Sequence, residues 1–216
     1  SVELYDTKEK KVVWSDRWQE KWDNLPTIKG SLSDGLLKVL DTKPKGEQKI
    51  DTSNPEAYEY YLRAKHNYEK RENKDDTEIA RGLLKKAIEL DDNLIVAKNL
   101  LGWTYSVTGD YDRAIGIFTP ALKQAEKIDD KVGMGRSLLG IGIVYSDKGD
   151  FGTALDYLER SLSIAEELGD KRGMGRILNS IGIVYGNKGD LDTALDYLER
   201  SLAIAEELGN KGGMGV

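Results

Sequence analysis

Hydrophobic residues in the second half of the chain recur in a pattern that is written twice. Residues 131–170 and 171–210 form two consecutive blocks, and 30 of their 40 positions are identical. A fixed period near this length is typical of a solenoid, in which each unit buries its apolar face only against its neighbours. The pattern therefore indicates an extended binding surface rather than a catalytic pocket.

Each block predicts two amphipathic helices separated by a Gly-Asp pair. Apolar residues at helical spacing stand on both sides of Gly189-Asp190: Ile177, Leu178, Ile181, Ile183 and Val184 before it, and Ala194, Leu195, Leu198 and Leu202 after it. We expect the glycine to end one helix in a left-handed conformation and the aspartate to cap the next. Corresponding pairs stand at Gly109-Asp110, Gly149-Asp150 and Gly169-Asp170.

Small residues mark the positions where paired helices are expected to touch. Gly182 and Ala194 are twelve residues apart, as are Gly142 and Ala154 and also Gly102 and Ala114. A large side chain at such a contact would push the two helices apart. We therefore expect Gly182 to matter for stability.

The chain resembles the tetratricopeptide repeat family in the order of its small and large positions. The residues that carry the resemblance are Leu101, Gly102, Tyr105, Ala114, Phe118 and Ala121, with Ala64, Ala80, Leu84 and Ala87 in an earlier, more diverged unit. The resemblance implies a mainly α fold, a superhelical solenoid of helix-turn-helix repeats. We expect repeats at about 53–92, 93–130, 131–170 and 171–210, with a further unit starting at 211–216. Ala80 and Ala114 are 34 residues apart and the next two intervals are 40, so the later helices should be longer by a turn or more.

The 40-residue units look most like the subclass found in Pins-type cell-polarity adaptors. That resemblance implies a concave groove that binds extended, often acidic peptides, with an arginine near the start of each first helix and an asparagine four residues later. Arg136 and Arg176 match the arginine. Asn179 follows Arg176 after only three residues, and Leu139 stands there in the preceding repeat, so the motif is incomplete.

The leading functional hypothesis is a non-catalytic module that binds a protein or peptide in this groove. The geometry of the family places a set of first-helix residues toward it: Asn99, Trp103, Arg136, Leu139, Ile143, Arg176, Asn179, Ile183 and Asn187, together with Val96, Ser106 and Asp147. Arginine supplies paired donors for carboxylates, and Trp103 offers an apolar anchor. The alternative interpretation is that these side chains are merely solvated.

The first fifty residues follow a different pattern. Alternating polar and apolar residues around 6–10 predict a β-hairpin, and residues 25–40 predict a helix, followed by a linker at 43–46. Residues 1–46 resemble the end of the TolB-like segment that precedes such repeats in bacterial adenylate cyclases and receptor-type kinases. Trp14 and Trp18 are expected to pack in the core rather than to stack on a ligand.

Composition excludes several classes of function. The net charge is −6, and the first 50 residues hold 10 basic and 9 acidic side chains, so the acidity lies in the repeats; this argues against nonspecific nucleic-acid binding. There is no cysteine and one histidine, His66, which rules out a thiolate metal site and a multi-histidine site within the chain. We expect no cofactor, no metal, no membrane insertion and no enzymatic activity.

Two other hypotheses remain open. The chain is either a catalytically silent regulatory segment of a signalling enzyme, such as a cyclase or kinase, or a self-assembly module. Near-identical repeats without a polar capping helix leave an apolar stacking face, and a short hairpin leaves a strand edge. Either surface predicts a homo-oligomer, through the repeat ends or through the hairpin edge.

Overall fold

The computed structural model describes residues 2–6, 11–16 and 54–213 of the chain, with side chains described for 54–209. In the first part, strands β1 (Val2–Asp6) and β2 (Lys11–Asp16) pair in antiparallel fashion, with a shift in register between Leu4 and Tyr5. The predicted helix at 25–40, the linker and the packing of Trp14 and Trp18 lie outside the described residues.

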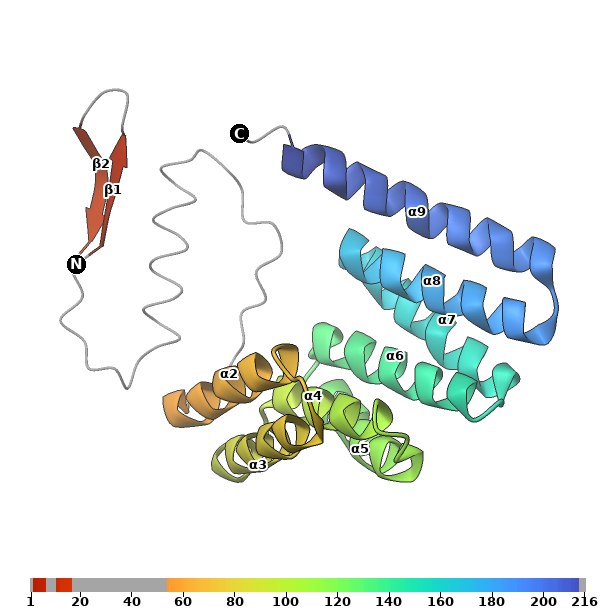
Figure 1. Cartoon of the computed structure of the whole chain (residues 1–216), viewed down its shortest axis with the longest axis horizontal. Coiled ribbons are helices and arrows are strands. Elements are labelled where there is room, and N and C mark those ends of the chain that lie inside the picture. The colour runs from red at the N-terminus through yellow and green to blue at the C-terminus, as the bar shows by residue number, and fades with distance from the viewer. Residues whose placement is uncertain (1, 7–10, 17–53, 214–216) are drawn as a thin grey trace.

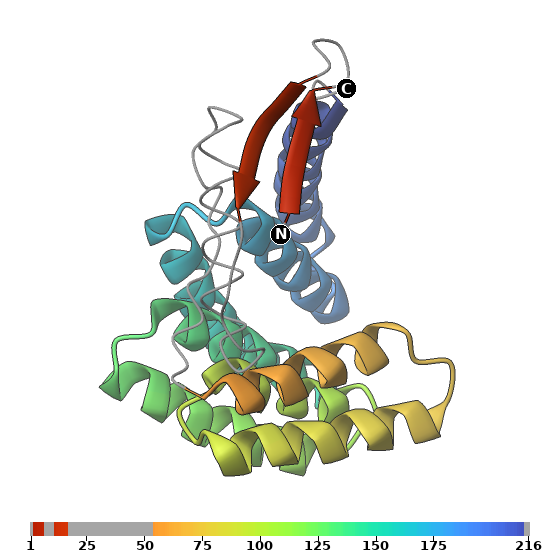
Figure 2. The ribbon, with the colours of Figure 1, turned by 90° about the vertical axis from the view of Figure 1, so that its left-hand side faces the viewer.

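The rest of the described chain is helical and folds as four consecutive helix pairs (Figure 1). The pairs are α2 (Pro55–Glu69) with α3 (Lys74–Leu90), α4 (Ile95–Ser106) with α5 (Tyr111–Lys127), α6 (Lys131–Asp147) with α7 (Phe151–Glu167), and α8 (Lys171–Lys188) with α9 (Leu191–Gly213). Each second helix also packs on the first helix of the following pair. Figure 2 shows that α2 and α9 run in different directions, so the helix pairs rotate along the array. The predicted mainly α solenoid is confirmed.

The extra length of the later repeats lies in their first helices. α4 has 12 residues, whereas α6 has 17 and α8 has 18, a gain of more than one turn. The second helices α3, α5 and α7 each have 17 residues, so the expected extra length is found in α6 and α8 and not in α5 or α7. α9 runs on to Gly213, through position 210 where we expected a repeat boundary.

The predicted helix punctuation is confirmed. Gly109, Gly149 and Gly189 have φ values of 76°, 82° and 85°, in the left-handed region where glycine meets no steric penalty. Asp150 then accepts a hydrogen bond from the backbone N–H of Thr153, and the other Gly-Asp pairs are followed by equivalent caps. Asp129, with φ of 56°, takes the place that Gly169 has one repeat later.

The paired helices touch at the small residues that the sequence singled out. A Cβ atom placed on Gly142 would lie 2.8 Å from Leu158 Cγ and 3.2 Å from the carbonyl oxygen of Ala154. On Gly182, a Cβ atom would lie at the same distances from Leu198 Cγ and the carbonyl oxygen of Ala194. Both distances are shorter than an ordinary carbon contact, so each pair requires glycine at this position.

Stacked tyrosines repeat with the same period. The ring centroids of Tyr145 and Tyr157 are 5.9 Å apart, and those of Tyr185 and Tyr197 are 5.6 Å apart, with nearly parallel planes. In each pair, one ring comes from the first helix and the other from the second helix. The repeated sequence therefore builds a repeated structure down to single side-chain contacts.

One buried charge, Arg81 on α3, fixes the end of the short helix α4. Its guanidinium donates to the Thr104 carbonyl and hydroxyl oxygens and to Thr108 Oγ1, and it lies over the ring of Tyr105 at 4.0 Å. Glu78 pairs with it at the surface. All of its donors point at protein groups, so Arg81 holds structure together and is not offered to a ligand.

The glycine contacts predict a graded loss of stability. Gly142→Ala should lower the free energy of unfolding by about 1–3 kcal/mol, because Leu158 is 0% exposed and cannot move aside. Gly182→Ala should lower it less, since Leu198 is 37% exposed and can swing toward solvent. Denaturant melts of both variants measure the difference.

Gly82 provides the control for these melts. It lies inside α3, and a Cβ atom there would meet nothing within 4 Å. Gly82→Ala should therefore stabilise the chain by about 0.5–1 kcal/mol, through helix propensity alone. Equal midpoints for the Gly82 and Gly142 variants would contradict the contact.

Candidate concave binding site

The first helices form a continuous layer on one side of the array. α2 contacts α4, α4 contacts α6 and α6 contacts α8, whereas no second helix of the described residues contacts another second helix. In a curved stack, helices on the inner side lie closer to one another than helices on the outer side, and here the first helices are the closer set. The concave face is therefore built from α2, α4, α6 and α8.

Residues of α6 and α8 share this layer but differ in exposure. On α8, Arg176, Asn179, Ile183 and Asn187 are exposed to solvent. On α6, Arg136, Leu139 and Ile143 are half-buried, and Leu139 and Ile143 pack against the core between α7 and α8. The face is thus more covered along α6 and more exposed along α8.

Arg136 of α6 is near enough to act electrostatically on Tyr61 of α2, two repeats earlier in the sequence. Tyr61 is buried, and burial raises the pKa of its phenol, while the positive charge of Arg136 opposes that rise. Tyr61 was not among the predicted groove residues. On the first helix of this more diverged repeat the sequence matched only Ala64 to the family pattern, and no groove residue was predicted there.

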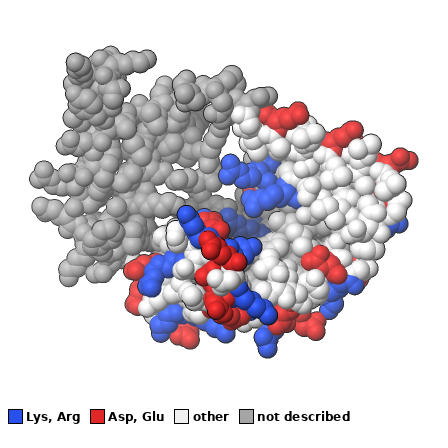
Figure 3. Space-filling view, viewed as in Figure 1, with Lys and Arg blue, Asp and Glu red and all other residues white. Residues whose placement is uncertain are grey.

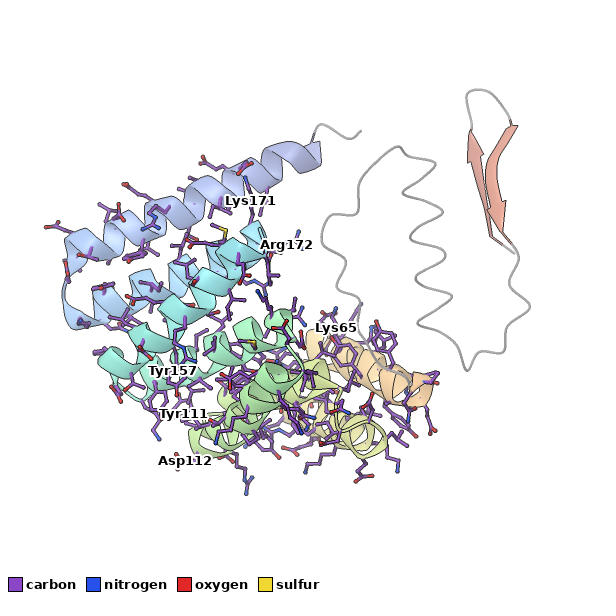
Figure 4. The ribbon with its side chains drawn as sticks, turned by 180° about the vertical axis from the view of Figure 1, so that it is seen from behind. Lys65, Tyr111, Asp112, Tyr157, Lys171 and Arg172 are labelled. Carbon is purple, nitrogen blue, oxygen red and sulfur yellow. The ribbon has the colours of Figure 1, made fainter. Side chains whose placement is uncertain are left out.

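Basic side chains gather on this part of the molecule. Figure 3 shows Lys and Arg over the start of α8 and continuing toward α2. Figure 4 shows Lys171 and Arg172 on α8 and Lys65 on α2, on the same side of the array. Lys171 pairs with Glu207, whereas among the described residues Arg172 and Arg176 have no acidic partner within 4 Å. Two arginines of α8 are thus available to an anionic group.

Asn99 must be removed from the predicted groove. It is 3% exposed, its Nδ2 donates to the carbonyl oxygen of Gly133 at 3.2 Å, and its Oδ1 accepts from Ser137 Oγ at 2.7 Å. The side chain therefore lies between α4 and α6, because a buried amide needs partners on both of its atoms. Val96 and Ser106 of the same helix are buried as well.

Trp103 is only partly available to a ligand. Its ring packs edge-on against Phe118, with the centroids 5.6 Å apart, and Trp103 is half-buried. It therefore contributes to the core of the second repeat and presents only part of its surface to the groove. Of the predicted residues on α4, it alone reaches solvent.

The opposite end of α6 carries an acidic group. Asp147 is exposed, yet partial burial of its carboxyl raises its pKa above the usual value. The groove therefore has arginines toward the starts of α6 and α8, apolar side chains in the middle, and Asp147 toward the end of α6.

Other kinds of site were sought in the same residues. Across residues 54–209, no group of three or more His, Asp or Glu side chains is arranged to hold a metal ion. Within the described helices, none combines the length and the hydropathy that crossing a bilayer requires.

Comparison with protein families gives one match. A family model described as tetratricopeptide repeat matches residues 93–167 and 134–207, two overlapping spans that together cover more than half of the chain. A comparison with curated proteins found no match.

Several solved structures share the fold. The crystal structure of aspartyl phosphate phosphatase F from Bacillus subtilis is 20% identical, with a TM-score of 0.62 over 87% of this chain and 48% of that one. The apo form of RapI is 15% identical, with a TM-score of 0.63 over 88% and 71%. MamA is 22% identical, with a TM-score of 0.53 over 90% and 99%. The chain spans about half the length of the phosphatase structure, and at these identities the likeness shows the fold alone.

The electrostatic influence of Arg136 on Tyr61 predicts a change in a tyrosine pKa. Arg136→Ala should raise the pKa of Tyr61 further, because the nearby positive charge that favours the phenolate is lost. NMR of ¹³C-labelled tyrosine through alkaline pH measures it. Arg113→Ala, next to Tyr105, is the control and should leave Tyr61 unchanged. An unaltered Tyr61 titration in Arg136→Ala would show that the two groups do not meet.

Proposed function

The chain belongs to the tetratricopeptide repeat family, and from this premise we propose that it is a non-catalytic scaffold that binds an extended segment of a partner protein along its concave face. The observation that carries the proposal is the row of exposed side chains on α8, Arg172, Arg176, Ile183 and Asn187, beside the half-buried apolar residues of α6. They are held by packed helices, so the binding surface is ordered before a partner arrives.

The chemistry of this face favours an acidic partner. Arg172 and Arg176 stand four residues apart on α8, one helical turn, so both reach the same stretch of a bound chain. Arginine donates in pairs to carboxylates and is the side chain best suited to recognise them. Leu139, Ile143 and Ile183 then provide contacts for apolar residues of the same segment.

The resemblance to Pins-type adaptors supports an acidic partner, although this chain keeps only part of the groove motif of those adaptors. Arg136 and Arg176 keep the arginine of that groove, but Arg136 is half-buried near Tyr61 and only Arg176 is fully open. With Asn99 buried, the amide for a peptide backbone is left to Asn187. We therefore place the binding surface on α6 and α8 rather than along the whole array.

A second candidate is a regulatory segment within a signalling enzyme. The resemblance of residues 1–46 to the end of a TolB-like segment favours it, since such segments precede these repeats in cyclases and receptor-type kinases. In that setting the concave face would still bind a protein, and the catalytic domain would be encoded elsewhere in the gene. Sequencing the coding region upstream tests this: a cyclase or kinase domain there supports it, and its absence rejects it.

Removing the two open arginines should weaken binding of an acidic peptide. The probe is a fluorescein-labelled peptide of alternating glutamate and leucine, followed by anisotropy. Exposed ion pairs contribute about 0.2–1 kcal/mol each, so Arg172→Ala with Arg176→Ala should raise Kd roughly two- to thirtyfold. Circular dichroism should show unchanged helicity.

The matched control removes the same charge elsewhere. Lys85 and Arg200 are exposed on the second helices α3 and α9. If Lys85→Ala with Arg200→Ala weakens the peptide as much, net charge rather than the concave face governs binding. If neither pair matters, the groove proposal is wrong.

We also propose that the chain self-associates through its hairpin edge. Within the described residues β1 pairs only with β2, so the outer edge of each strand has backbone groups free to pair with another copy. Light scattering over a concentration series should show a rising mean mass. Deleting residues 1–16 should return the mass to that of a monomer; a monomer at every concentration for the intact chain would count against the proposal.

A further inference from the structure

The last helix, α9, exposes an apolar face that its counterpart α7 buries. Leu191, Leu195, Leu198 and Leu202 are 71%, 57%, 37% and 58% exposed, and their spacing puts them along one side of the helix. The residues 40 positions earlier, Phe151, Leu155, Leu158 and Leu162, pack against Ile177, Ile181 and Val184 of α8. The exposed leucines of α9 therefore correspond to the residues with which α7 packs on the next first helix, α8.

The opposite end of the array does not present a matching surface. Exposed residues of α2 are mainly charged, and they include Glu56, Glu59, Arg63, Lys65 and Glu69. Glu59 and Arg63 approach each other at 3.9 Å across one turn. End-to-end stacking of a second copy, α2 on α9, would bury these charges against leucines, which is unfavourable.

The interfaces between consecutive first helices differ in whether their central contact is polar or apolar. Between α4 and α6, Asn99 is joined to Ser137 Oγ and to the Gly133 carbonyl oxygen, and Ser137 is 0% exposed. A Cβ atom on Gly133 would lie 2.8 Å from Ile95 Cγ2, so α6 approaches α4 closely here. The first two turns of α6 thus provide the hydrogen-bond partners of the buried Asn99 amide.

Between α6 and α8 both members of this polar pair are replaced together. Leu139 stands 40 residues after Asn99, and Ile177 stands 40 residues after Ser137. Leu139 packs against the cluster that contains Ile177, which is buried. One interface is therefore polar on both sides and the next is apolar on both sides, as the desolvation of an unpaired amide or hydroxyl demands.

The third member of the series is Asn179, on the exposed end. It is 80 residues after Asn99 and restores the amide. It is exposed, and among the described residues its side chain makes no hydrogen bond. On the precedent of Asn99, its partners would be a backbone carbonyl in the first turn of an incoming helix and a hydroxyl four residues later in that helix.

We propose that the face formed by Asn179 and the exposed leucines of α9 docks one kind of partner, another repeat unit whose first helix carries a hydroxyl at its seventh residue. α6, with Ser137 as the seventh residue from Lys131, has this form, and α8, with Ile177, does not. Asn179 is the positioning residue that selects between them. The partner unit stacks on α8 and α9 in the register that α6 takes on α4 and α5.

The pairing rule can be tested first inside the intact chain. Asn99→Leu strands the Ser137 hydroxyl and the Gly133 carbonyl, and Ser137→Ile crowds the amide of Asn99. The double variant reproduces the Leu139 and Ile177 pair. Its denaturation midpoint should lie closer to the parent than that of either single variant. Additive losses in the double variant would overturn the rule.

The docking face is tested by extending the chain with one further repeat unit after α9. Residues 211–216 are replaced by a copy of residues 131–170, whose seventh residue is either serine, as in α6, or isoleucine. Each version is made with Asn179 and with Asn179→Leu. The matched combinations, Asn179 with serine and Asn179→Leu with isoleucine, should show higher denaturation midpoints and slower amide exchange in α9 than the crossed combinations.

Three other outcomes would overturn the proposal. Equal midpoints in all four versions would mean that Asn179 does not select a partner. An added unit that leaves α9 exchange unchanged would mean that the face does not accept it. If light scattering of the unextended chain shows a dimer that Leu198→Asp dissociates, while deleting residues 1–16 does not, then a second copy occupies the face.

Discussion

The close approach of the two helices within each repeat is the contact on which the rest of the array depends. At Gly142 and Gly182 there is no room for a Cβ atom between one helix and the leucine and backbone of the other. Because the two helices of a pair meet this closely, each pair behaves as one unit. The apolar faces of that unit lie on its two sides along the stack, and only the neighbouring repeats can cover them. The glycines thus set the pair geometry, and the stack follows from it.

This geometry separates two kinds of surface. The interfaces between consecutive first helices are buried, and they differ in chemistry from one to the next, as Asn99 and Leu139 show. The concave side of the same helices stays open, and there Arg172, Arg176 and Ile183 are displayed without being needed for packing. A solenoid can therefore change what it binds with little effect on how it stacks, which is the physical basis for the binding function proposed above.

Much of the fold could be predicted from the sequence because its determinants are local or repeated. The left-handed glycines, the aspartate caps and the Gly182 contact each depend on residues at a fixed spacing, and all three were confirmed. Asn99 was misplaced because its environment depends on Ser137, a neighbour in space that the period does not reveal. Tyr61 was missed because no groove residue was predicted on the first helix of the first repeat, and the electrostatic influence of Arg136 on it depends on the three-dimensional fold.

The central claim, that the concave face of α6 and α8 is the binding surface, is tested most directly by NMR mapping. Backbone amide shifts are followed while the glutamate-leucine peptide is titrated into the ¹⁵N-labelled chain. The account predicts that the largest shifts fall on α6 and α8, around Arg136, Arg176 and Ile183. Shifts confined to the second helices α5, α7 and α9 would contradict it.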